Sequence, residues 1–157
     1  MQIVKIGLLI VIGDFIVRTI LLSLREDVYK KVLSGEKIYE HRKVFSDEHV
    51  KAYIYVSSPM KSICGIMYLS NIIRHLYLNG EKNLKMIPNV SRELMNICQS
   101  INLLWKENTN AIPLSKLRDD LTKFIVHQMY YFIENSELLE YLEKNLIPDG
   151  VLVTHTY

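Results

Sequence analysis

The chain has 157 residues, of which 49% are hydrophobic and 23% charged, so it has the size and composition of one globular domain rather than of a disordered or fibrous protein. The formal net charge of +2 excludes the strongly basic proteins that coat nucleic acids, although a local basic patch remains compatible with it. The two cysteines, Cys64 and Cys98, form no Cys-x-x-Cys pair, and the five histidines show no metal-ligand spacing. We therefore expect no metal and no cofactor, and two unpaired thiols that fit a cytoplasmic protein.

Residues 6–13 are continuously apolar, and two structures fit this run. One is a membrane anchor, but a spanning helix here would carry Lys5, Asp14 and Arg18, and a charge near the bilayer centre costs about 2.5–3.5 kcal/mol. The other is a pair of strands with Gly13 and Asp14 as the two-residue turn between them. We favour the strand pair, so residues 1–17 are expected to add a strand and the protein to need no membrane.

A strand followed by a short helix is predicted next. Residues 19–24 are a β-rich apolar run, and Ser23-x-x-Glu26 has the spacing of a capping box at a helix start. The apolar spacing continues to about Ser34, and Gly35 stands where a left-handed helix cap is needed.

Three further strands are predicted over residues 37–44, 52–59 and 63–73. In the first, Glu40 and Arg42 share one side because side chains alternate along a strand. The second ends in a Ser-Ser-Pro turn, and Gly65 marks a bulge or a close backbone approach in the third.

The pattern beyond Arg74 changes from strand to helix. Apolar residues at helical spacing predict helices over 91–105, 114–134 and 136–145, followed by a last strand over 150–157. Residues 81–145 are therefore expected to form a helical insertion before the last strand.

The block from residue 19 to residue 74 resembles the ASCH family. The family's motif, Gly-x-Lys-x-x-Glu-x-Arg after a strand and a helix, is matched at each fixed position by Gly35, Lys37, Glu40 and Arg42. The resemblance implies a single α+β domain over residues 1–157, built on a PUA-like β-barrel. In it, a short helix would precede the motif strand and the helical insertion would precede the last strand.

Members of this family are mostly inferred to bind RNA or its components, some in roles near transcription or translation. A subset are enzymes, namely small amidohydrolases acting on acetylated cytidine and a member with ribonuclease activity. In the amidohydrolases the motif lysine is catalytic and a threonine three positions later assists it. Lys37 matches that lysine, whereas Glu40 stands at the threonine position.

The motif residues also have a chemistry of their own. Lys37 could bind a phosphate as a point charge or, if desolvated, act as a base or nucleophile. Arg42 offers a planar fork for a phosphate or a base edge, and Glu40 could accept from a base amino group. Equally, Glu40 and Arg42 could form an ion pair that orients the strand without any ligand.

These observations leave three hypotheses open. The first is an RNA-binding module, because basic residues interleaved with aromatic ones suit single-stranded RNA, although nearby acidic residues dilute the patch. The second is a small hydrolase acting on a modified nucleoside or on RNA, with Lys37 and Glu40 as its catalytic pair. The third is a protein-interaction domain using the helical insertion. The sequence does not indicate the oligomeric state. The predicted nucleic-acid or nucleotide contacts are Lys37, Tyr39, Glu40, Arg42, Lys43, Ser57 and Ser58, of which the two serines also fit a simple turn.

Overall fold

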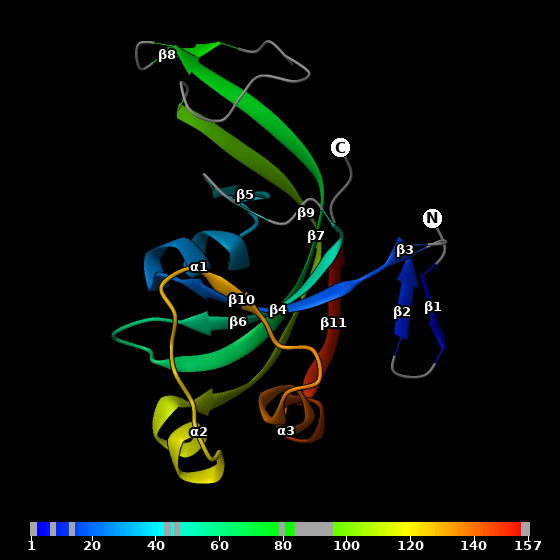
Figure 1. Cartoon of the computed structure of the whole chain (residues 1–157), viewed down its shortest axis with the longest axis vertical. Coiled ribbons are helices and arrows are strands. Elements are labelled where there is room, and N and C mark those ends of the chain that lie inside the picture. Colours follow the sequence, from blue (N-terminus) through cyan, green and yellow to red (C-terminus); the bar gives the residue numbers. More distant parts are fainter. Residues whose placement is uncertain are drawn as a thin grey trace.

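A computed structural model describes the backbone of residues 3–6, 9–12, 15–42, 45, 48–78, 81–83 and 96–154, and the side chains of residues 17–40, 45, 48–70, 103, 106–151 and 153. The fold is α+β, as predicted. Its helices are α1 (Glu26–Leu33), α2 (Leu114–Asp120) and α3 (Glu137–Asn145) (Figure 1). Its strands are β1 (Ile3–Ile6), β2 (Leu9–Ile12), β3 (Phe15–Ile16), β4 (Arg18–Leu24), β5 (Tyr39–Arg42), β6 (Val50–Val56), β7 (Ser62–Leu78), β8 (Glu81–Asn83), β9 (Asn96–Pro113), β10 (Tyr130–Phe132) and β11 (Pro148–Thr154).

The N-terminal strands form a small antiparallel sheet of their own, in the order β1-β2-β3. Ile12 lies opposite Phe15 in an antiparallel pair, which confirms the predicted pairing of strands on either side of Gly13 and Asp14, and these two residues themselves lie outside the described part of the chain. The apolar run divides into two strands instead of continuing as one. Within the described parts of the chain, no helix has both the length and the apolarity that a membrane crossing needs.

The main sheet runs in the order β10-β4-β6-β7-β9-β11. Strands β4 and β6 are parallel, with α1 in the connection between them, and the other neighbouring strands are antiparallel. Strand β5 pairs with residues 99–102 of β9. Strand β11 pairs with the same edge of β9, from residue 105 onward. In the described residues no pairing joins β10 to β11, so the sheet is curved but open where the resemblance implied a barrel.

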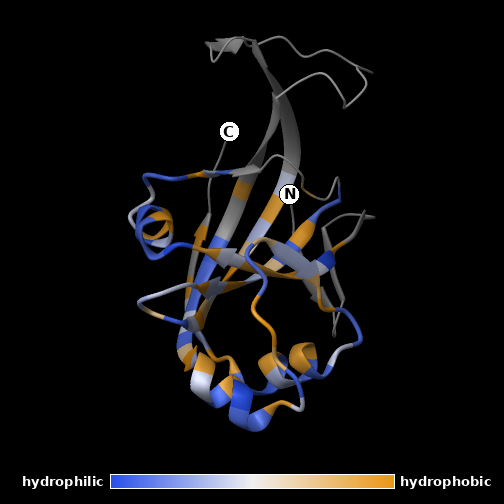
Figure 2. Ribbon diagram, turned by 60° about the vertical axis from the view of Figure 1, so that its left-hand side comes forward, coloured by the Kyte–Doolittle hydropathy of each residue, from blue (hydrophilic) through white to orange (hydrophobic). Residues whose placement is uncertain are grey.

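The core has two halves, one on each face of this sheet. Alternation along β4 sends Ile20 and Leu22 to the side covered by α1, and Leu21 to the side covered by α2 and α3. Helices α2 and α3, at the bottom of Figure 2, carry both hydrophobic and hydrophilic residues, as amphipathic cover helices do. Leu117 of α2 and Leu142 of α3 are fully buried against the sheet.

The predicted helix over 91–105 is wrong. Residues from Asn96 onward belong to β9, an 18-residue strand, while residues 91–95 lie outside the described part of the chain. The strand pairs with β7 along one edge and with β5 and β11 along the other, and this pairing overrides the helical spacing of its apolar residues.

The rest of the expected helical insertion is helical only in part. The helix predicted over 114–134 is restricted to α2, and Tyr130–Phe132 form the edge strand β10. The last predicted helix is confirmed as α3, where Ser136 Oγ accepts from the Leu139 N–H at 3.2 Å as a helix cap. Of the three helices predicted for the insertion, the described residues contain α2 and α3, and the protein-interaction hypothesis stays a prediction.

The capping-box prediction is also wrong. Ser23 lies inside β4, where its hydroxyl donates to the His127 carbonyl at 2.5 Å, and Arg25 occupies the cap position of α1 without a side-chain cap bond. The helix begins at Glu26 nonetheless, because its apolar side packs on the sheet.

Candidate functional site

Helix α1 is fixed to the sheet by a close contact with β7. The Tyr29 hydroxyl, which is buried, donates to the Cys64 carbonyl at 3.1 Å. A Cβ atom on Gly65 would lie 3.0 Å from the Tyr29 hydroxyl oxygen, so the absence of a side chain there lets the tyrosine approach. The register of β6 and β7 shifts next to Gly65, which confirms the predicted bulge.

The chain turns back on itself where α1 ends. Gly35 has φ +77°, the left-handed conformation predicted for it, and its N–H donates to the Val32 carbonyl at 3.2 Å. The N–H of Lys37 then donates to the Lys31 carbonyl at 2.9 Å. Lys37 is therefore held against the last turn of the helix by its own backbone.

Strand β5 continues from this turn and joins β9. The Leu103 N–H donates to the Ile38 carbonyl at 3.0 Å, and Glu40 lies opposite Ile101 in the ladder. Lys37 Nζ and Glu40 Oε2 are 3.5 Å apart, and their side chains are only 20% and 10% exposed. The structure thus brings together the lysine and the glutamate of the motif as a mostly buried ion pair.

The remaining predicted residues of the motif strand are described less fully. Tyr39 is partly buried on β5. The backbone of Arg42 lies opposite Gln99, and its side chain is outside the described residues, as is the whole of Lys43. A Glu40–Arg42 ion pair therefore stays a prediction.

Ser57 and Ser58 lie at the opposite end of α1. The Ser57 N–H donates to the Leu24 carbonyl at 2.8 Å, which closes the turn after β6 against the end of β4. Ser58 lines an open cleft of about 460 Å³ together with Pro59 and the first turn of α1. Since α1 has 8 residues, this cleft and the Lys37–Glu40 pair are separated by about 12 Å of helix.

The charges in that cleft are paired with one another. Arg25 contacts Asp27 at 2.8 Å, and Lys30 contacts Glu26 at 2.6 Å. The two serines there are explained by the turn that they form, and the structure does not bring them to the motif pair.

Lys106 is a residue at this site that the sequence analysis did not single out. It lies on β9 with only 6% of its surface exposed, and its Nζ donates to the carbonyls of Val32 and Leu33 at 2.6 and 2.7 Å. Burial lowers the pKa of Lys106. The apolar spacing of residues 91–105 predicts a helix, and such a helix gives residue 106 neither a strand nor a partner.

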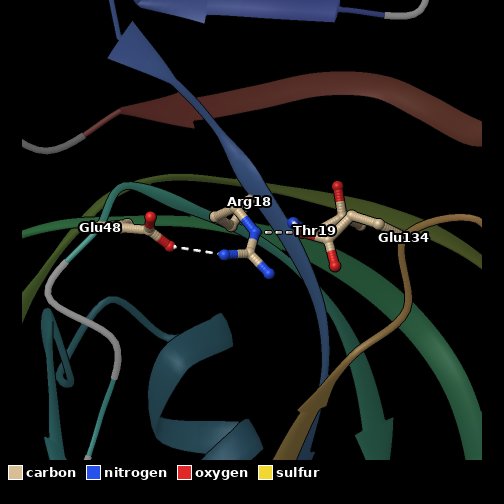
Figure 3. A network of polar contacts seen from close by, with 4 residues as sticks. All are labelled: Arg18, Thr19, Glu48 and Glu134. Carbon is tan, nitrogen blue, oxygen red and sulfur yellow. Dashed lines mark hydrogen bonds and ion pairs between the residues drawn. The ribbon is translucent and has the colours of Figure 1, made fainter.

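A second polar network, around Arg18, joins the start of β4 to the residues just before β6 and just after β10 (Figure 3). Arg18 Nε donates to Glu134 Oε1 at 2.7 Å and Arg18 Nη1 donates to Glu48 Oε2 at 3.0 Å, while the Thr19 N–H donates to the same Glu134 oxygen at 2.8 Å. The guanidinium also lies 4.0 Å from the centre of the Phe132 ring. Burial opposes the charged form of Glu134, but the hydrogen bonds from Arg18 and Thr19 outweigh it, so the pKa of Glu134 is lowered.

Comparisons with known proteins identify the fold. No protein-family model matches the sequence, and no curated protein matches it. Among solved structures, a crystal structure of ASCH from Zymomonas mobilis matches with a TM-score of 0.60 and 19% identity, over 82% of this chain and 96% of that chain.

Two variants of the Zymomonas protein match equally well. A serine-to-alanine form has a TM-score of 0.60 and 17% identity, over 81% of this chain and 96% of that chain. A tyrosine-to-phenylalanine form has a TM-score of 0.60 and 18% identity, over 82% of this chain and 99% of that chain. The chain therefore has the ASCH fold, and the resemblance predicted from the motif is confirmed at the level of the fold.

Proposed function

We propose that this protein of ASCH fold binds single-stranded RNA at the turn and strand that carry the motif, residues 35–42. The observation that carries the proposal is the mostly buried Lys37–Glu40 pair, 3.5 Å apart at the end of α1. A lysine ammonium binds a phosphate as a point charge, and a carboxylate accepts from the amino group of a base. One short segment thus offers a group for the backbone of RNA and a group for its bases.

Neighbouring residues fit the same ligand. Unpaired bases are the usual targets of proteins that recognise RNA, and aromatic side chains stack on them. Tyr39 adds an aromatic ring beside the pair, and Arg42 and Lys43 would add positive charge further along the strand. Ser57 and Ser58 would contact an RNA that is long enough to follow α1 to its other end.

The test is a binding titration with a pool of short single-stranded RNAs at several salt concentrations. We expect Lys37→Ala to weaken binding and to reduce the slope of log affinity against log salt by about 0.7, the value for one lost phosphate contact on a single strand. Lys116→Ala is the matched control, because Lys116 is also ion-paired, 2.9 Å from Asp120, but lies on α2. Absence of any affinity in low salt, or equal effects of the two substitutions, would refute the proposal.

Glu40→Gln separates the two halves of the pair. It keeps the shape of the side chain and removes its charge, so the phosphate contact of Lys37 should persist. We expect the salt slope to stay as in the wild type while the preference among RNAs that differ by one base decreases. A preference that is unchanged would assign Glu40 a structural role.

The geometry of the pair also favours a second candidate, hydrolysis of a modified nucleoside or of RNA. A lysine and a carboxylate 3.5 Å apart and largely shielded from water can donate and accept a proton in turn. Chromatography of acetylated cytidine and of the RNA pool after incubation with the protein tests this reaction. Product that disappears with Lys37→Ala would establish an enzyme, whereas intact substrates would leave recognition alone.

A further inference from the structure

Lys106 occupies a position where packing alone favours an apolar residue. It lies opposite Met67 in the ladder of β9 and β7, on the face of the sheet where Met67, Leu69 and Leu103 form the core under α1. Burying a lysine costs free energy that an apolar side chain of the same length would not cost. The lysine must therefore be explained by what its ammonium contacts.

The Lys106 ammonium provides hydrogen-bond donors for backbone carbonyls at the end of α1. The last four carbonyls of a helix have no partner within it, and the negative end of the helix dipole lies there. Lys106 Nζ donates to two of these carbonyls, those of Val32 and Leu33, from a strand more than 70 positions away in the sequence. Both bonds carry a charged donor and are accordingly strong.

The same strand holds the segment that follows the helix. Leu103, three residues before Lys106 on β9, donates its N–H to the Ile38 carbonyl at 3.0 Å. Lys37 therefore lies between two attachments to β9, one at the end of α1 and one at the start of β5. Its own N–H bonds to the Lys31 carbonyl at 2.9 Å, in the same last turn of α1 that Lys106 contacts.

We infer that Lys106 is a positioning residue for RNA binding: by fixing the end of α1 to β9, it sets where the Lys37 ammonium meets Glu40 and the ligand. This inference rests on the function proposed above and deepens it. Lys106 itself contacts no RNA, because only 6% of its surface is exposed and its donors point at the helix.

The first test needs no RNA. Lys106→Met keeps the length of the side chain and removes its donors. We expect hydrogen exchange at the Lys37 amide to accelerate by about tenfold or more relative to the wild type, since the last turn of α1 opens locally. Leu142→Ala is the control for general destabilisation, because Leu142 is fully buried on the opposite face of the sheet. Unchanged exchange at Lys37 in Lys106→Met, or the same acceleration in Leu142→Ala, would overturn the inference.

The second test is a double-mutant cycle in the RNA titration. Lys106→Met should weaken binding about tenfold in the wild-type protein but have little effect when Lys37 is already alanine, because coupled residues are not additive. Lys106→Arg keeps a cation with several donors and should restore most of the affinity. Equal losses in both backgrounds would overturn the inference even though Lys37 binds RNA. If the wild type binds no RNA at all, the proposed function fails, and the exchange measurement still decides whether Lys106 positions Lys37.

Discussion

The contact between Gly65 and Tyr29 can be tested by adding a single methyl group. In Gly65→Ala the new Cβ would lie 3.0 Å from the Tyr29 hydroxyl oxygen and 3.5 Å from the Glu107 carbonyl oxygen. Overpacking of this kind costs about 1–3 kcal/mol, and the loss of glycine's freedom in the unfolded chain offsets about 0.5–1 kcal/mol of it. We therefore expect a net loss in the free energy of unfolding of about 1 kcal/mol.

Removing the tyrosine hydroxyl should reverse the sign of this effect. Tyr29→Phe alone costs about 1–2 kcal/mol, because it deletes the hydrogen bond to the buried Cys64 carbonyl. It also removes the atom that the new methyl group would meet. In the Tyr29→Phe background, Gly65→Ala should therefore be neutral or stabilising by about 0.5 kcal/mol, which gives a coupling of about 1–2 kcal/mol between the two sites.

Urea denaturation of the four proteins, followed by circular dichroism, measures this coupling. The slopes against urea should agree among the four, so that differences in midpoint report stability. Additive effects within about 0.5 kcal/mol would refute the reasoning, because they would mean that the methyl group and the hydroxyl do not compete for one space.

Three further predictions concern other parts of the fold. Leu142→Ala should lower the free energy of unfolding by about 2–5 kcal/mol in urea, since Leu142 is fully buried; a loss below 1 kcal/mol would mean that α3 is not part of the core. Gly35→Ala should cost about 1 kcal/mol, because φ is +77° with no atom within 4 Å of the added Cβ, so an unchanged midpoint would contradict the left-handed turn. The pKa of Glu134 is lower in the folded protein than its usual value of 4.5, so its ion pair stabilises the fold at a pH above 4.5. This stabilisation is lost as the pH falls through the lower pKa of the folded state. Glu134→Gln should therefore flatten the acid side of the stability profile, and a profile identical to that of the wild type would exclude this carboxylate as its source.

Local rules predicted the elements that carry the motif. The strand at 19–24, the helix after it and the glycine that ends the helix depend on residues close in sequence, and each appears where its pattern places it. The residue that caps α1 was less predictable. Ser23 has the right spacing to Glu26, but it lies inside β4, and Arg25 occupies the cap position instead.

The failures share a physical cause. Residues from Asn96 onward have apolar spacing that suits a helix, and only their pairing with β7, β5 and β11 makes them a strand. That pairing involves residues far away along the chain, so no local window contains it. No local pattern indicates Lys106 for the same reason, since its partners Val32 and Leu33 belong to a helix more than 70 residues earlier in the sequence.

The place of β10 in the sheet has a consequence for the order of folding. Strands β4, β6 and β7 with α1 are close in sequence, so this unit can form early, with little loop-closure entropy to overcome. Strand β10 reaches the edge of β4 from the far part of the chain, and the bond from Thr19 to Glu134 spans 115 positions. The pairing of β10 with β4 is therefore expected to form last, after β4, β6, β7 and α1 have come together.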